Sequence, residues 1–214
     1  VAMMKKINLK LLFLTSILTL LPILVGLILW KDLPASLPSH FGLDGQADGF
    51  SSKQEVVFLI PLLMLGLHLF AVIVTSLDPK ASHVSPKMKT LVYWLVPFIS
   101  GLVQLSIYGA AFGLIGNSTR IGLVMVGIVF LVVGNYLPKT KQNYTVGIRL
   151  PWTLDSEENW NKTHRLAGRL WVLGGLIILV NGFLSWAVFY VFFGVLLVMV
   201  LVPIFYSYWI SRGQ

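Results

Sequence analysis

The segment Gly134–Gly168 reads GNYLPKTKQNYTVGIRLPWTLDSEENWNKTHRLAG, and the segment Leu37–Lys53 reads LPSHFGLDGQADGFSSK. Both segments are polar, and each lies between hydrophobic runs. Of the 214 residues, 57% are hydrophobic and only 11% are charged, and the mean hydropathy is +0.84. A soluble domain carries about 25% charged residues, so this composition indicates an integral membrane protein.

Six hydrophobic runs are long enough to be membrane spans, since one span needs roughly 20 apolar residues. The first run is too long for a signal-peptide core and no small-residue cleavage site follows it, so we interpret it as a span. The last two runs are nearly continuous, and only Asn181-Gly182 and Ser185-Trp186 indicate a turn between them. The expected spans are Leu11–Trp30, Val56–Leu77, Leu91–Ile115, Ile121–Leu137, Leu170–Trp186 and Ala187–Ile210.

The expected fold is an all-α integral membrane protein, a bundle of about six transmembrane helices with a cytoplasmic amphipathic helix before the fifth span. We divide the chain into an N-terminal four-span region, residues 1–137, with an outer loop at 31–55, and a C-terminal region, residues 138–214, with the longer polar segment and the last two spans. Six spans leave no room for a soluble catalytic domain. Cysteine is absent from the chain, which excludes disulfides and thiolate chemistry.

The basic residues predict how the chain crosses the membrane. A net charge of +8 could indicate nucleic-acid binding in a soluble protein, but here the basic residues lie in loops, where they set topology, and we expect no direct contact with nucleic acid. With the N-terminus inside, 13 of the 16 Lys and Arg residues face the cytoplasm. Both termini are therefore predicted to be cytoplasmic, with Leu37–Lys53 outside and Gly134–Gly168 inside.

The outer loop is rich in turn-forming residues and mildly acidic. Asp44-Gly45 and Asp48-Gly49 are turn dipeptides, and the alternation around His40 allows a short hairpin. The carboxylates would attract a cationic extracellular partner. The residues expected on this outer site are Pro38, His40, Asp44, Gly45, Asp48 and Lys53.

The stretch from Asp44 to Glu55, DGQADGFSSKQE, is close to the pattern of a calcium-binding loop. Gln46 departs from the pattern at its third position, and Ser51 stands where a hydrophobic residue usually closes the loop. We therefore favour a turn-rich loop with solvated carboxylates, in which His40 is a hydrogen-bonding side chain and not a ligand. No metal site and no cofactor are expected.

The longer polar segment contains a helix signal. Asp155 can cap a helix, and Glu158 completes an acidic variant of the capping box three residues later. Charged residues line one face, where Glu158 and Lys162 have the favourable i,i+4 spacing. The opposite face comprises Trp160, His164, Ala167 and Trp171. We expect an interfacial amphipathic helix that runs into the fifth span; its basic face is either a docking platform for a cytoplasmic partner or, as spacing alone favours, an anchor at the membrane surface.

Two features lie inside the expected spans. His68 is an ionisable residue at mid-span, which makes it a functional candidate. A hydrogen bond to a neighbouring helix, through Gln104 or Asn181, is the favoured interpretation. Gly109 and Gly113 form a G-x-x-x-G pattern that permits close helix packing.

The stretch GNYLPKTKQNYTVGIRLPWTL, followed by W-x-x-x-H-R at residues 160–165, resembles the signature of the SdpI/YfhL family of bacterial membrane immunity proteins. The outer loop resembles the small membrane domain of unknown function that commonly precedes this signature. The signature positions expected to dock a cytoplasmic partner are Asn135, Pro138, Lys139, Asn143, Gly147, Arg149, Pro151, Trp152, Thr153, Trp160, His164 and Arg165.

The resemblance implies a multipass protein in the lipid bilayer of the bacterial plasma membrane that protects the producing cell against a secreted toxic peptide of the sporulation-delaying type. It further implies a second role, in which the toxin-bound protein draws a small winged-helix repressor to the membrane. Two alternatives stay open. A membrane peptidase would need a nucleophile or metal motif, and no HExxH or G-x-S-x-G is present, so no catalytic residue is expected. A peptide transporter would be expected to carry buried charges within its spans.

Overall fold

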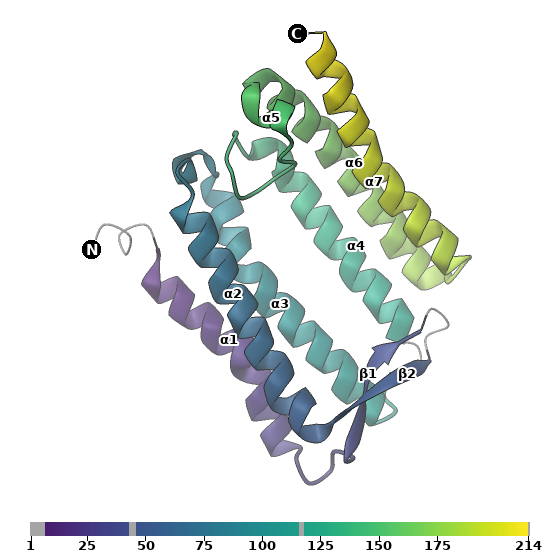
Figure 1. The fold of residues 1–214 in the computed structure, drawn as a ribbon. Helices are drawn as coiled ribbons and strands as arrows, with labels where there is room; N and C mark the ends of the chain where they lie inside the picture. Colours follow the sequence, from purple (N-terminus) through teal and green to yellow (C-terminus); the bar gives the residue numbers. More distant parts are fainter. Residues whose placement is uncertain (1–6, 43–45, 116–117, 214) are drawn as a thin grey trace. The chain divides into compact units, whose positions relative to one another are not determined.

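The computed structural model describes residues 7–42, 46–115 and 118–213, and helices dominate these ranges (Figure 1). Six of the described helical segments are long and apolar enough to cross a membrane. The long helices are α1 (Leu9–Ile28), α2 (Ile60–Leu77), α3 (Pro86–Ala111), α4 (Ser118–Tyr136), α6 (Glu157–Leu184) and α7 (Val188–Arg212). The expected all-α membrane fold with about six spans is confirmed.

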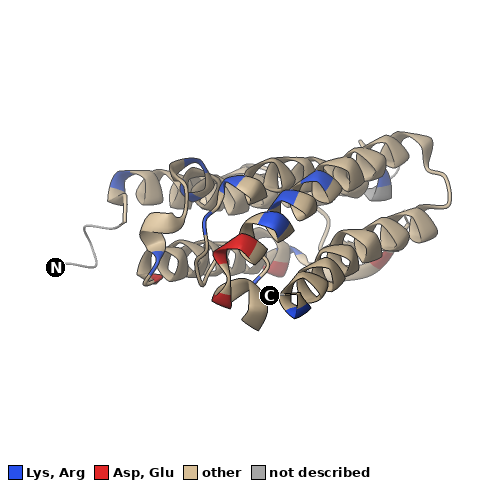
Figure 2. Ribbon diagram, turned by 90° about the horizontal axis from the view of Figure 1, so that it is seen from above, with Lys and Arg blue, Asp and Glu red and all other residues tan. Residues whose placement is uncertain are grey.

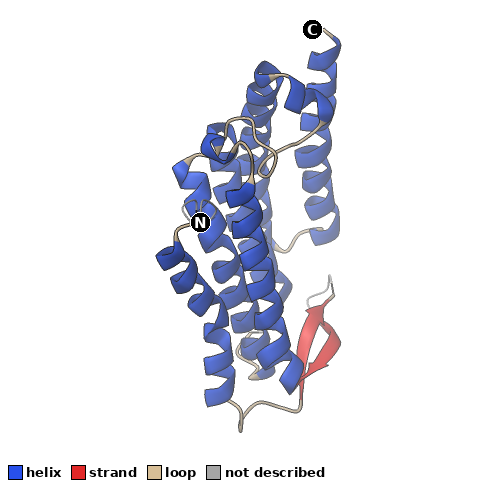
Figure 3. Ribbon diagram, turned by 60° about the vertical axis from the view of Figure 1, so that its left-hand side comes forward, coloured by secondary structure: helices blue, strands red, loops and turns tan. Residues whose placement is uncertain are grey.

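Shorter elements connect the long helices. They are the strands β1 (Ser36–Phe41) and β2 (Ala47–Ser52), the π-helical turn η2 (Glu55–Leu59), the 3-10 turns η3 (Ala81–His83) and η4 (Leu137–Lys139), and the helix α5 (Pro151–Asp155). The two strands pair antiparallel, with Leu37 opposite Ser51, and form the small sheet drawn in red in Figure 3. The short hairpin that the outer-loop sequence allows is therefore present.

The described residues form two compact units. The N-terminal unit contains the described residues up to Leu77 together with those between Thr90 and Ile121, and the C-terminal unit contains Asp78–Lys89 and the described residues from Gly122 onward. The connection between α2 and α3 thus belongs with the C-terminal helices. The boundary predicted between residues 137 and 138 stays a prediction.

A buried polar pair joins α1 to α2 in the N-terminal unit. Thr15 Oγ1 lies 2.9 Å from His68 Nε2, and both side chains are fully buried. The expected hydrogen bond from His68 to a neighbouring helix is therefore present, but its partner is Thr15 and not Gln104 or Asn181. Gln104 Nε2 donates instead to the backbone carbonyl of Val56, at 2.7 Å. Both bonds follow from the rule that a polar group inside a span needs a partner within the protein.

Close glycine packing occurs in the C-terminal unit. The packing face predicted for Gly109 and Gly113 was wrong, because α3 ends at Ala111 and Gly113 follows it with a φ of 67°. In α4 and α6, by contrast, a Cβ added at Gly127 would lie 2.8 Å from the carbonyl oxygen of Gly175, and the reverse substitution gives the same distance. Helices in a membrane approach this closely only where both carry small residues.

A second glycine pair lies seven residues later in α4 and seven residues earlier in α6. A Cβ at Gly134 of α4 would lie 3.0 Å from the carbonyl oxygen of Gly168 of α6, and one at Gly168 would lie 2.8 Å from that of Gly134. The two pairs hold α4 and α6 antiparallel and in backbone contact. The segment that joins these helices therefore starts and ends at neighbouring points.

Helix α6 is capped by Ser156, whose hydroxyl accepts a hydrogen bond from the backbone N–H of Asn159. The prediction that Asp155 caps this helix was wrong, since Asp155 ends the separate helix α5. The amphipathic stretch and the fifth span form one helix of 28 residues, about 42 Å long. Acidic residues open α6 and basic residues follow (Figure 2), and Lys162 Nζ lies 2.6 Å from Glu158 Oε1, as the i,i+4 spacing predicts.

Helix α7 returns beside α6 after a tight turn. Ser185 and Ala187 in this turn have positive φ angles of 52° and 42°, which places the reversal where the sequence indicates it. Trp171 of α6 donates its indole N–H to the backbone carbonyl of Met199 at 3.2 Å. The last two spans therefore form a helical hairpin.

Candidate functional site

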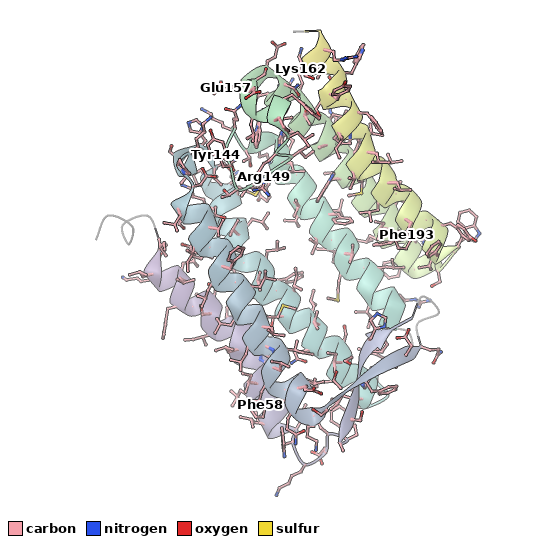
Figure 4. The ribbon with its side chains drawn as sticks, in the orientation of Figure 1. Phe58, Tyr144, Arg149, Glu157, Lys162 and Phe193 are labelled. Atoms are coloured by element: carbon pink, nitrogen blue, oxygen red, sulfur yellow. The ribbon has the colours of Figure 1, made fainter. Side chains whose placement is uncertain are left out.

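Most residues of the predicted inner site lie in the connection between α4 and α6, residues 137–156, which we term the signature loop. It contains η4 and α5 but little other regular structure. Its backbone polar groups therefore need partners from outside any helix or sheet. Two of its side chains, Tyr144 and Arg149, are labelled in Figure 4, and Arg149 Nη1 donates to the carbonyl oxygen of Tyr144 at 2.7 Å.

Asp78 anchors the signature loop from the connection between α2 and α3. Its Oδ2 accepts from the backbone N–H of Tyr144 and from the hydroxyl of Thr145, both at 2.8 Å, and its Oδ1 accepts from the N–H of Lys80 at 2.7 Å. The residue is only 2% exposed. A buried carboxylate is retained where several donors compensate for lost solvation, so Asp78 holds two distant stretches of the chain together.

Gln142 adds a second link between the same two stretches. Its Oε1 accepts from Lys80 Nζ at 2.7 Å, and His83 Nδ1 lies 2.9 Å from its backbone carbonyl oxygen. The side-chain amide of Gln142 donates in turn to the carbonyl oxygens of Thr153 and Leu154. One buried amide thereby connects the α2–α3 connection, the loop and α5.

Asn143 stabilises the centre of the loop, because its side chain hydrogen-bonds to the backbone of nearby loop residues. Its Oδ1 accepts from the backbone N–H groups of Thr145 and Val146, at 2.9 and 2.7 Å, and its amide donates to the carbonyl oxygens of Lys141 and Val146. The side chain is fully buried. Its oxygen and its amide group therefore both have backbone partners, which makes Asn143 the internal scaffold of this turn.

Trp160 and His164 lie one turn apart on α6 and hydrogen-bond to the loop. The Trp160 indole N–H donates to the carbonyl oxygen of Thr140 at 2.8 Å. The imidazole of His164 stacks on this ring at 3.9 Å and 20°, and its Nε2 accepts from the backbone N–H of Ile148 at 2.8 Å. Because Nε2 accepts, the proton of the neutral ring lies on Nδ1, which donates to the carbonyl oxygen of Trp160.

Gly147 is required where the loop crosses this aromatic pair. Its φ is 124°, a conformation that L side chains rarely adopt, and an added Cβ would overlap His164 Nε2 and lie 3.0 Å from the Trp160 ring. The absence of a side chain lets the backbone approach closely enough for the Ile148 N–H to reach the imidazole. The predicted residues Gly147, Trp160 and His164 thus form one packed unit.

Thr153 and Trp152 attach the end of the loop. Thr153 Oγ1 accepts from the N–H of Leu150 at 2.9 Å and donates to the carbonyl oxygen of Ile148 at 2.8 Å. Trp152 donates its indole N–H to Ser207 Oγ of α7 at 2.8 Å. The loop is therefore bonded to the last span as well as to α6.

The remaining predicted inner residues lie at the surface. They are Asn135, Pro138, Lys139, Arg149, Pro151 and Arg165. The structure thus separates the predicted inner site into a buried set that shapes the loop and an exposed set that a partner could reach. Sequence reasoning missed Asp78 and Gln142; the available signal was that Asp78 is the only acidic residue between Glu55 and Asp155.

The outer hairpin is fixed to the N-terminal unit by an apolar cluster and by Lys53. The cluster comprises Leu33, Leu37, Val56, Val57, Ile107 and Tyr108. Lys53 Nζ donates to the carbonyl oxygen of Trp30 at 2.8 Å and lies 5.2 Å from the centre of its ring. Pro38 is buried as well. These two predicted outer residues therefore position the hairpin.

His40 and Asp48 face solvent on the hairpin. Their side chains are 74% and 54% exposed, and His40 Nδ1 lies 2.5 Å from Asp48 Oδ1. Phe50, on the same strand as Asp48, is 62% exposed. Asp44 and Gly45 lie outside the described residues. Across the described ranges, three or more His, Cys, Asp and Glu side chains do not converge anywhere as a metal-binding group.

Comparisons with known proteins place the chain among bacterial membrane proteins. The sequence profile of the SdpI/YfhL protein family matches residues 139–207, and that of a Domain of unknown function (DUF1648) matches residues 17–65. The chain is 29% identical over 174 residues to the Immunity protein SdpI of Bacillus subtilis (strain 168), an alignment that covers 79% of this chain and 80% of that protein. No solved structure matches.

Replacing Asp78 with Asn should loosen the signature loop. The amide keeps the shape but has one acceptor oxygen in place of two, so at least one donor loses its bond, at a cost of about 1–3 kcal/mol. Limited digestion of the detergent-purified protein with trypsin should then cut after Lys141 or Arg149 at least roughly fivefold faster. The matched control is Asp155→Asn, at the exposed end of α5. Equal digestion rates for Asp78→Asn and the unmodified protein would contradict the anchoring role.

Proposed function

Because the chain belongs to the SdpI/YfhL family, we propose that it protects its cell against a secreted toxic peptide of the sporulation-delaying type. The observation that carries the proposal is the similarity to a protein named as an immunity protein, which extends over 79% of the chain. Six apolar helices and this family support a multipass bacterial membrane protein.

The β1–β2 hairpin supports the part of the proposal that concerns the toxin. Its solvent-facing side offers the carboxylate of Asp48 beside His40, and the apolar ring of Phe50 close in sequence. A cationic amphipathic peptide would find opposite charge and apolar contact on this side. With 13 of 16 basic residues assigned to the cytoplasm, the hairpin faces the outside of the cell.

Expression of the chain in a toxin-sensitive bacterium should allow growth in purified toxin, and His40→Gln with Asp48→Asn should reduce that resistance. The double variant removes the Asp48 carboxylate and the His40 imidazole but keeps side chains of similar size. Gln54→Ala, at an exposed position that follows β2, is the control, and membrane levels are compared by immunoblot.

Several outcomes would overturn this assignment. Full resistance in the double variant would exclude the His40–Asp48 pair from toxin contact. Recovery of cleaved toxin from resistant cultures would replace the proposal with a peptidase. Intact toxin that does not stay bound to resistant cells would favour a transporter.

We further propose that two exposed basic residues, Arg149 of the signature loop and Arg165 of α6, form the docking surface for a cytoplasmic repressor. Arg149 is held by its bond to the Tyr144 carbonyl, so its guanidinium is presented from an ordered loop. Arg165 is exposed on α6, one residue after the buried His164. Toxin can promote docking only if it binds the docking-competent arrangement of the helices more tightly than the other arrangement.

Replacing Arg149 and Arg165 together with Ala should abolish toxin-dependent movement of a fluorescently tagged repressor to the membrane. Toxin resistance should persist, because the outer hairpin is unchanged. The control is Lys10→Ala with Lys87→Ala, which removes the same charge from exposed positions predicted on the same side of the membrane. Unaltered recruitment in the Arg149 and Arg165 variant would show that the repressor does not use this surface.

A further inference from the structure

An open groove of about 500 Å³ lies between the end of α4 and the middle of α6, within the C-terminal unit. Its apolar lining includes Gly134, Pro138, Gly168, Val172 and Leu173. The second glycine pair lies among its lining residues. Its surface is mostly apolar.

Two cations are among the residues that line the groove. Lys139 and Arg169 both line it and both are exposed. Glu158–Lys162 is an ion pair among the described residues, and neither Lys139 nor Arg169 belongs to it. Lys139 Nζ donates to Asn135 Oδ1 at 3.4 Å and lies 4.8 Å from the centre of the Tyr136 ring, and both partners are neutral. The groove therefore presents uncompensated positive charge next to an apolar wall.

The depth of the groove matches the boundary between hydrocarbon and water. The candidate span that contains α4 ends at Lys139. Helix α6 is about 42 Å long, and a hydrocarbon core of about 30 Å covers only some 20 of its 28 residues. Twenty residues counted back from Leu184 reach Arg165, so Arg169 lies about 6 Å inside this edge of the core, a depth from which its long side chain can reach the headgroups. Leu173, 57% exposed, lies deeper in the core.

We propose that this groove binds an anionic phospholipid, with the phosphate between Lys139 and Arg169 and an acyl chain along Val172 and Leu173. The combination of cations at headgroup depth and an apolar wall below them fits an amphipathic anion and fits neither a soluble anion nor a neutral lipid. Basic pockets between membrane helices on the positively charged side are known to hold such headgroups. The role is separate from toxin resistance and repressor docking.

Native mass spectrometry of the detergent-purified full chain tests the assignment by titration with phosphatidylglycerol, phosphatidylcholine and inorganic phosphate. Phosphatidylglycerol should bind, and the other two should not bind at the same concentration. The double variant Lys139→Gln with Arg169→Gln should weaken phosphatidylglycerol binding roughly thirtyfold, since each cation near an anionic headgroup contributes roughly fivefold.

The double variant Lys10→Gln with Lys87→Gln, which removes the same charge elsewhere, should leave the affinity unchanged. Lys139→Arg with Arg169→Lys keeps both charges and should retain binding, which separates lost recognition from lost folding. Equal affinity of the Lys139 and Arg169 double-Gln variant and the unmodified protein would overturn the proposal. Equal binding of phosphatidylcholine, or of inorganic phosphate, would overturn it too.

Discussion

An irregular connection between two membrane helices keeps one shape only if its backbone N–H and C=O groups are bonded. In the signature loop, side chains from three elements of the C-terminal unit make these bonds. Five backbone N–H groups between residues 144 and 150 donate to side chains instead of to a helix or sheet. The side chains that accept them are Asp78, Asn143, Thr153 and His164. The positions of the exposed residues Tyr144 and Arg149 depend on this buried set.

The glycine pairs between α4 and α6 make that arrangement possible. They bring the two ends of the loop to neighbouring points, so the intervening residues form a compact cap over Trp160 and His164. The residues of the signature therefore fall into two groups, one buried and one exposed. Its buried members shape the loop, while Lys139, Arg149 and Arg165 are exposed. A variant that removes a buried member alters the surface indirectly, through loss of loop order.

Hydropathy and spacing were sufficient to predict the six spans, the outer hairpin and the helical continuity of α6, because each depends on local periodicity or on the length of an apolar run. The anchoring role of Asp78 was not predictable in this way, since its partner Tyr144 lies 66 residues away. The amphipathic pattern of α6 correctly identified a face with Trp160 and His164. The same pattern fits a face that meets the membrane and a face that a loop covers, so burial under the loop could be recognised only from the fold.

The G-x-x-x-G pattern at Gly109 failed for a related reason. Close packing requires that both glycines lie within one helix and face a partner, and α3 ends between them. The glycines that do pack lie seven residues apart on each of two helices, a spacing that becomes informative only once the pairing of the helices is known. Local rules thus predicted the elements, whereas contacts between elements determined which residues shape the site.

Amide hydrogen exchange of the detergent-purified protein tests most directly whether buried side chains order the signature loop. Peptides that cover residues 142–150 should exchange orders of magnitude more slowly than an unstructured peptide of the same sequence, because their N–H groups are bonded to side chains inside the fold. Exchange of these amides at the rate of an unstructured peptide would contradict the account and would show that the loop has no fixed shape.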